Sequence, residues 1–224
     1  MPREIKKAAL CGFYEYDFEN CHYAIFNQMA ASSGYECEAI RKYLAFKDEV
    51  RVGIAGRAEI TKDQVKQCLL GLMYGARTTM WPDNAIPRLI EHKAIRLFRD
   101  PVFTAIAGDV KRGRSVILNH WPKRRTTLMN DMNKTISLKT KAEDRLAHLI
   151  QGVEAKALLT ALELYPGEVV LPMHDGFVTK NPIDAKLIER QVLASTGYRL
   201  ELSGGAIVPS PDLGFPKREH HTSH

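Results

Sequence analysis

Apolar residues recur at the spacing of an α-helix over several stretches of the chain, and most of these stretches carry helix start or stop signals. Thr61 offers an N-cap for one helix, and Pro166-Gly167 ends a longer one. The predicted helices comprise residues 20–32, 36–49, 62–75, 139–164 and 182–194. Helices are therefore expected to supply most of the regular structure.

Strand-like patterns lie nearer the two ends of the chain. Residues 9–17 alternate well enough for one strand, and two β-branched runs flank His174-Asp175-Gly176 within residues 168–180. Asp-Gly supplies the positive φ angles of a tight turn, so this segment is predicted to be a hairpin. Residues 198–202 and 205–208 predict one or two closing strands. The whole pattern predicts an α/β fold of the α+β type with a small antiparallel sheet.

Composition fits one compact globular domain without a membrane partner. Of the 224 residues, 45% are hydrophobic and 26% are charged. No apolar run is long enough to span a bilayer, and the N-terminus lacks the apolar core of a secretory signal. The expected location is the cytoplasm, or the host cytoplasm for a viral protein. The four cysteines show no Cys-x-x-Cys spacing and indicate neither a zinc knuckle nor a disulfide framework.

Six basic residues gather around Trp121 in a chain whose formal charge is only +6. They are Lys111, Arg112, Arg114, Lys123, Arg124 and Arg125. A cluster of this kind either contacts nucleic-acid phosphates or forms a solvated charged loop, and both interpretations remain open. The other tryptophan, Trp81, is expected in the core.

Two aspartates occupy positions that suit metal-dependent phosphoryl chemistry. Asp17 closes the predicted strand 9–17, and Asp175 lies at the tip of the predicted hairpin. If the two strands are antiparallel neighbours, both carboxylates reach one edge of the sheet. Two Mg²⁺ ions about 4 Å apart, with Mn²⁺ as a substitute, need hard oxygen ligands from such rigid elements. Glu19 is a further acid that shares the face of Asp17 only if the strand continues.

The predicted helix 62–75 supplies positive charge between the two aspartates. Lys62, Lys66, Leu70 and Tyr74 follow one another in steps of four and form one stripe. Such a stripe either presents two ammonium groups and an aromatic ring to a triphosphate or is one face of an amphipathic surface helix.

The order of these motifs resembles the DNA polymerase I superfamily, most closely its bacteriophage-type single-subunit RNA polymerases. DFENCHYAIF at residues 17–26, Lys66 followed by Tyr74-Gly75, and His174-Asp175 resemble motifs A, B and C. Residues 145–162 resemble the helix that precedes motif C in that superfamily. The resemblance covers about residues 13–180 and implies a polymerase palm with helical fingers.

The resemblance implies a role for each matched residue. Asp17 and Asp175 would be the catalytic metal ligands, with the backbone carbonyl of Phe18 as a further ligand. Lys66 and Tyr74 would act on the incoming nucleoside triphosphate. The remaining implied contacts are those of His22, Lys62 and Leu70 with the nucleotide, and those of His148, Gln151 and His174 with the nucleic acid.

Three differences from the DNA-synthesising members of the superfamily favour ribonucleotides. His22 stands where those members carry a glutamate that blocks a ribose 2′-hydroxyl, Leu70 stands where they carry Phe or Tyr, and His-Asp-Gly replaces their His-Asp-Glu. The resemblance therefore implies a minimal DNA-dependent RNA polymerase or a primer-synthesising enzyme. A DNA polymerase of the same superfamily is the alternative. The implied partners are a nucleic-acid template, a primer or nascent strand, and nucleoside triphosphates.

The expected organisation is a single catalytic unit over residues 1–224. Its palm is expected at residues 1–35 and 139–210, its fingers-like part at 36–138, and a polar tail at 211–224. Motif A begins within the first twenty residues, so no thumb is expected upstream of it. This organisation implies short products, or a second polypeptide that supplies the thumb.

Two other classes of function stay open on the residues alone. An HD-type metal phosphohydrolase would use His148, His174-Asp175 and either Asp184 or Asp212. Such enzymes need their His-Asp pair on a helix, whereas the proline and β-branched residues around this pair favour a hairpin. The other class is a catalytically inactive nucleic-acid-binding module with a polymerase-like fold.

Overall fold

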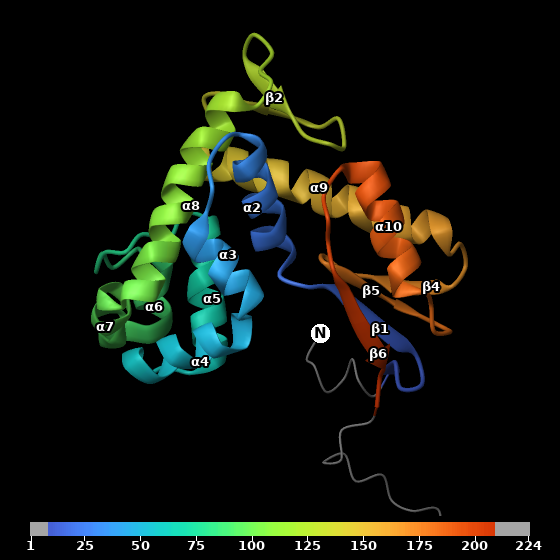
Figure 1. The fold of residues 1–224 in the computed structure, drawn as a ribbon, viewed down its shortest axis with the longest axis horizontal. Helices are drawn as coiled ribbons and strands as arrows, with labels where there is room; N and C mark the ends of the chain where they lie inside the picture. The colour runs from blue at the N-terminus through green and yellow to red at the C-terminus, as the bar shows by residue number, and fades with distance from the viewer. Residues whose placement is uncertain (1–8, 209–224) are drawn as a thin grey trace, which may run out of the picture.

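The computed structural model describes residues 9–208, which form a sheet lobe and a helical lobe (Figure 1). The sheet lobe contains β1 (Tyr14–Phe18), α9 (Ala142–Leu164), β4 (Val169–Pro172), β5 (Gly176–Thr179), α10 (Ala185–Thr196) and β6 (Leu202–Ala206). The helical lobe contains α3 (Glu38–Ala45), α4 (Lys47–Ala58), α5 (Lys62–Met73), α6 (Ala85–Ile90), the 3₁₀ turn η1 (Glu91–Lys93), α7 (Ala94–Arg99) and α8 (Pro101–His120). Helix α2 (Cys21–Ser32) leads from the first lobe to the second, and a small hairpin of β2 (Thr127–Met129) and β3 (Thr135–Ser137) follows α8.

The main sheet has the strand order β4-β5-β1-β6, and every neighbouring pair is antiparallel. The α+β prediction with a small antiparallel sheet is therefore confirmed. Strand β1 lies in the interior of the sheet, where Asp17 faces Gly176 of β5 on one side and Ser203 of β6 on the other. Tyr16 stacks on Phe177 with ring centroids 5.6 Å apart, which anchors β1 to β5.

Helix α9 joins the two lobes. It packs against α2 and α8 as well as α10. Leu149, Val153 and Ala157, spaced four residues apart, are all fully buried and form its inner stripe. Within the described residues no helix has an apolar run long enough to cross a membrane.

Several predicted elements have different bounds in the structure. The predicted strand 9–17 is a strand only from Tyr14, because Gly12 lies in a preceding turn with φ +88°. The predicted helix 36–49 is two helices, since Phe46 leaves the helical region with φ −131° and ψ 46°. The segment 101–120 was not predicted to be helical, and it forms the long helix α8.

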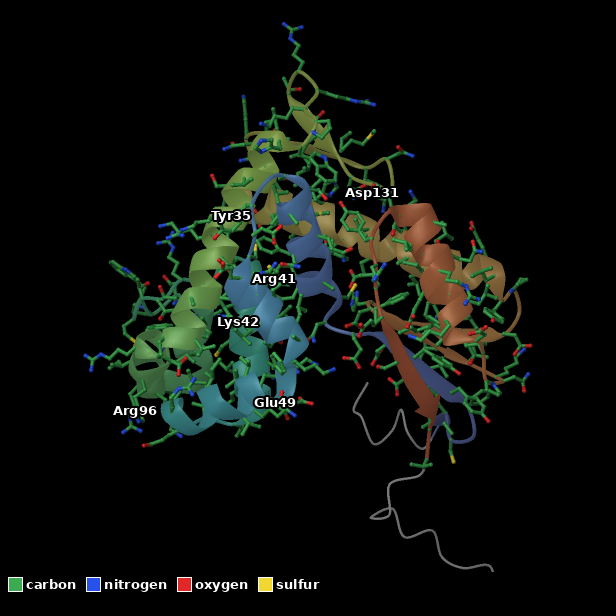
Figure 2. The ribbon with its side chains drawn as sticks, viewed as in Figure 1. Tyr35, Arg41, Lys42, Glu49, Arg96 and Asp131 are labelled. Carbon is green, nitrogen blue, oxygen red and sulfur yellow. The ribbon has the colours of Figure 1, made fainter. Side chains whose placement is uncertain are left out.

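Asp109 on α8 ties this helix to the start of α3. Its carboxylate accepts hydrogen bonds from the Tyr35 hydroxyl at 2.8 Å and from the backbone amides of Ala39 and Ile40 (Tyr35 is labelled in Figure 2). A carboxylate at the N-terminus of a helix satisfies amides that have no partner within the helix. Asp109 therefore orders the helical lobe.

Trp81 lies on the surface with 68% of the residue exposed, so the prediction that it fills the core was wrong. The buried side chain of Asn84 organises the loop instead. It accepts a hydrogen bond from the Arg77 amide at 3.0 Å and donates to the carbonyls of Arg77 and Thr79. Hydrogen bonds between the Asn84 side chain and the backbone therefore hold this loop, and a buried Trp81 does not.

Candidate active site

Asp17 and Asp175 come together where β1 ends and β5 begins, as the sequence predicted. Asp17 pairs with Gly176, the residue after Asp175, and the Phe18 amide donates to the Asp175 carbonyl at 2.7 Å. Both residues also line one pocket, so their carboxylates are candidates for holding metal ions. The two acidic residues thus project from one rigid backbone junction.

The hairpin at Asp175 is confirmed, but its turn differs from the predicted one. The Met173 amide donates to the Gly176 carbonyl at 2.8 Å. Gly176 has no positive φ, and neither does Asp175. Glycine is required here for space, because a Cβ on Gly176 would lie 2.2 Å from the Asp17 Oδ1 and 2.2 Å from the Tyr16 carbonyl oxygen. The close approach of β5 to β1 therefore depends on this glycine.

A pocket of about 250 Å³ opens beside the two aspartates. Its walls come from β1, α2, α3, α4, α5, β6 and the β4–β5 turn. Predicted site residues that line it are Asp17, Phe18, His22, Lys66, Leu70 and Asp175. Elements far apart in the sequence therefore bring the expected metal, phosphate and sugar contacts to one cavity.

Arg51 of α4 adds a second cation to this pocket beside Lys66. Only 8% of Arg51 is exposed. Its Nη2 donates to Asn20 Oδ1 at 2.7 Å, and its guanidinium also contacts the hydroxyl and ring of Tyr43. These contacts hold a guanidinium in place where it can meet an anion.

The predicted stripe on α5 divides between two neighbours. Lys66 and Leu70 line the pocket, whereas Lys62 Nζ pairs with Asp48 Oδ1 at 2.7 Å on the side of α4. Thr61 and Gln64 form the capping box that starts α5, which confirms the predicted N-cap. Tyr74 is the C-cap residue at the far end.

His22 links the aspartate pocket to α9. Its Nδ1 lies 3.2 Å from the Tyr74 hydroxyl, and its Nε2 lies 3.0 Å from Glu154 Oε1. Burial raises the pKa of the Tyr74 hydroxyl, as do the charges of Glu154, Cys21 and Asp175, while a hydrogen bond from Gln151 lowers it. Tyr74 therefore remains a neutral hydroxyl at physiological pH.

The three residues expected to contact nucleic acid also share a cavity. His148, Gln151 and His174 line a groove of about 450 Å³ together with Glu154 and Lys134. The His148 Nε2 donates to the Lys134 carbonyl at 2.9 Å, which fixes its ring at the groove wall. This cavity, called the α9 groove below, includes Glu154, whose Oε1 contacts His22 Nε2.

The basic cluster around Trp121 is split by the fold. Lys111, Arg112 and Arg114 lie on α8, whereas residues 123–125, called the basic loop below, are exposed between α8 and β2. Arg114 is largely buried, with its Nη1 3.0 Å from Glu143 Oε1 and its Nη2 donating to the Leu72 carbonyl. Arg114 therefore connects α5, α8 and α9, and the basic loop keeps its side chains toward solvent.

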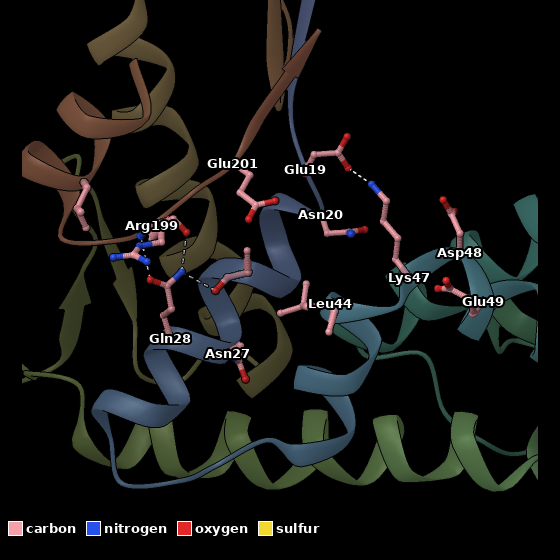
Figure 3. A pocket seen from close by; sticks show the side chains of 13 residues that line it. Glu19, Asn20, Asn27, Gln28, Leu44, Lys47, Asp48, Glu49, Arg199 and Glu201 are labelled. Atoms are coloured by element: carbon pink, nitrogen blue, oxygen red, sulfur yellow. Dashed lines mark hydrogen bonds and ion pairs between the residues drawn. The ribbon is translucent and has the colours of Figure 1, made fainter. Parts of the chain in front are cut away.

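A larger pocket of about 820 Å³ lies next to the aspartate pocket, between α2, the corner of α3 and α4, and the chain before β6 (Figure 3). Glu19 borders both cavities and pairs with Lys47, as the dashed line in Figure 3 marks. Burial raises the pKa of Glu19, but hydrogen bonds from Lys47 and Ser203 outweigh it and lower the pKa overall. The Glu19 carboxylate is thus ionised, and the paired Lys47 balances its charge. The larger cavity contains neither Asp17 nor Asp175.

The ligand set of an HD-type phosphohydrolase is not brought together within residues 9–208. His174-Asp175 lies at a hairpin, His148 lines the α9 groove, and Asp184 caps α10 by accepting from the Leu187 amide at 3.1 Å. Asp212 lies outside the described residues, as does the predicted tail 211–224. Over the same range no group of three or more His, Cys, Asp or Glu side chains is arranged to hold a metal ion.

Arg51 and Glu154 are the two residues that the sequence analysis missed. Arg51 lies beyond the end of the predicted helix 36–49, so the sequence pattern did not place it on a helix that faces the pocket. Glu154 lies three positions after Gln151 on α9 and shares its face, which is the one signal that could have identified it.

Comparison with known proteins gives similarities to solved structures. No protein-family model matches the chain, and no curated protein matches it. A solved structure of the POL domain of Pol1 from M. smegmatis, in complex with DNA primer-template and dNTP, aligns at a TM-score of 0.49 and 13% sequence identity. The alignment covers 88% of this chain and 39% of that chain. The chain thus spans well under half of the length of that polymerase chain.

Proposed function

We propose that this protein is a template-directed nucleotidyltransferase whose active site is the aspartate pocket. The observation that supports this most is the meeting of Asp17, Asp175 and Lys66 in one cavity, from three separate elements. Carboxylates for metal ions beside cations for phosphate are the groups that phosphoryl transfer requires. The proposed palm comprises residues 1–35 and 139–210, and the proposed fingers comprise residues 36–138.

Magnesium suits the two aspartates, because Mg²⁺ is commonly held by one or two carboxylates together with substrate phosphates. When bound, it would lower the pKa of a strand 3′-hydroxyl and neutralise charge on the leaving group. Asp17 and Asp175 are the residues proposed to hold it, with the Phe18 carbonyl as a further ligand.

In the proposed reaction the 3′-hydroxyl oxygen of the growing strand bonds to the α-phosphorus of a nucleoside triphosphate. The bond from that phosphorus to the bridging oxygen breaks, and pyrophosphate and a proton leave. Lys66 and Arg51 would orient the triphosphate and offset its charge. His22 and Tyr74 would contact the sugar, and the α9 groove would hold the paired strand end.

The proposal extends to ribonucleotides as the preferred substrate, which makes the protein a minimal RNA polymerase or a primer-synthesising enzyme. Its support is the imidazole of His22 in the pocket, at the position where the DNA-synthesising members of the resembled superfamily carry a glutamate that blocks a 2′-hydroxyl. A DNA polymerase remains the competing outcome of the test below.

The test is nucleotide incorporation by the purified chain on primed and unprimed single-stranded DNA, with rNTPs and dNTPs in parallel. Asp17→Asn and Asp175→Asn should each abolish extension by removing ligand charge, while nucleic-acid binding stays within about twofold of wild type. Template-dependent product that survives both substitutions would refute the assignment. Binding without product from the wild-type chain would identify an inactive module or a chain that needs a second polypeptide.

A further inference from the structure

A continuous set of side-chain contacts joins Tyr74, His22 and Glu154. Both ring nitrogens of His22 are engaged, Nδ1 by the Tyr74 hydroxyl at 3.2 Å and Nε2 by Glu154 Oε1 at 3.0 Å. The rings of His22 and Tyr74 also meet edge to face, with centroids 5.7 Å apart. This geometry gives the imidazole one defined orientation.

Glu154 is the fixed end of this set. Only 7% of Glu154 is exposed, and its side chain projects from the middle of the long helix α9. A buried carboxylate needs hydrogen-bond donors, and His22 Nε2 supplies one. His22 itself lies in the first turn of α2 with 19% of its side chain exposed. Rotation of the imidazole toward the pocket would therefore leave a buried acid without this donor.

The position of Glu154 gives this arrangement a functional meaning. Glu154 lines the α9 groove, whereas His22 lines the aspartate pocket. With Nε2–H donated to Glu154, Nδ1 accepts from Tyr74, and the Tyr74 oxygen keeps a lone pair that can accept from a ligand hydroxyl. A ribose 2′-hydroxyl can donate to that oxygen, and a deoxyribose lacks this hydroxyl.

We propose, building on the proposed function, that Glu154 is a positioning residue for sugar selection. It ties His22 to α9, which leaves room beside the sugar and points Nδ1 at Tyr74. Loss of Glu154 would free the imidazole to turn into the sugar space, so that ribonucleotides bind less well relative to deoxyribonucleotides.

The experiment measures equilibrium binding of ATP and dATP, with Mg²⁺ and primed template present, and the same two nucleotides in single-turnover extension. The ratio of the two affinities should shift toward dATP by about tenfold in Glu154→Ala, which corresponds to about 1.4 kcal/mol. Glu154→Gln keeps an acceptor for Nε2–H and should retain most of the wild-type ratio. His22→Ala and the His22→Ala/Glu154→Ala double variant should share one ratio, because Glu154 acts through His22.

An unchanged ratio in Glu154→Ala would overturn the inference, and so would equal losses in Glu154→Ala and Glu154→Gln. Additive effects in the double variant would show that Glu154 acts by another route and would also overturn it. A wild-type chain that binds neither nucleotide would instead refute the proposed function, so the two failures are distinguishable.

Discussion

Gly176→Ala should separate the two strands that bear the aspartates. A Cβ at this position would lie 2.2 Å from the Asp17 carboxylate and 2.2 Å from the Tyr16 carbonyl oxygen, well inside the 3.0 Å that real Cβ contacts respect. The Tyr16 carbonyl belongs to the backbone of an interior strand and cannot rotate away, so the hairpin of β4 and β5 has to move. Overpacking of this kind costs about 1–3 kcal/mol. For a chain of this size, the middle of that range lowers Tm by about 4–8 °C.

Two other glycines of the sheet provide matched controls. A Cβ on Gly205 would meet open space, so Gly205→Ala should change the stability by no more than about 0.5 kcal/mol. A Cβ on Gly204 would lie 2.2 Å from the Glu15 carbonyl oxygen, on the β6 side of β1. Gly204→Ala should therefore lower Tm as Gly176→Ala does, but without a clash with the Asp17 carboxylate.

The assay combines thermal unfolding, followed by circular dichroism, with nucleotide incorporation well below the lowest Tm. Incorporation by Gly176→Ala should fall by at least about tenfold while Gly204→Ala retains most of its activity, because a shift of about 1 Å at the reacting groups has large effects on rate. The reasoning would be refuted by a Gly176→Ala protein that melts and incorporates nucleotides like Gly205→Ala.

Three further predictions concern the ion pair of Asp100 with Arg57, the cap of α5 at Thr61 and the basic loop. Burial raises the pKa of Asp100, but Arg57 Nε at 2.5 Å and two backbone amides of α8 outweigh it and lower the pKa overall. The stabilising contribution of the ionised Asp100 carboxylate is therefore complete above the unfolded pKa of about 4 and is lost as the pH falls through the lower folded value. The free energy of unfolding, measured with urea at pH 7 and at pH 3, should differ less between the two pH values for Asp100→Asn than for wild type. Equal differences would contradict this. Thr61→Ala removes the capping hydrogen bond to the Gln64 amide and should cost about 1 kcal/mol in urea unfolding, whereas Thr61→Ser should not; identical midpoints for the two variants would disprove the role of the cap. Replacing all three side chains of the basic loop by serine should reduce the salt dependence of single-stranded DNA binding by about two units of slope, and an unchanged slope would exclude the loop from the interface.

The sequence by itself determined the elements that carry the site. The cap of α5 at Thr61, the inner stripe of α9 and the hairpin around Asp175 each depend on residues only a few positions apart, so local spacing reveals them. Local spacing also predicts the order of the two aspartates and of the helix with Lys66 between them. Strand pairing of Asp17 beside Asp175 followed as a prediction once both segments were identified as strands.

Only the tertiary structure decided which side chains meet. His22 and Glu154 are 132 positions apart, and Lys62 turns to Asp48 although it shares a helical stripe with Lys66. Gly176 is a glycine because β1 passes close to it, which no turn rule anticipates. Periodicity specifies the face on which a side chain lies, but the partner of that face depends on how distant elements pack. The network that we propose selects the sugar is therefore a property of the assembled lobes.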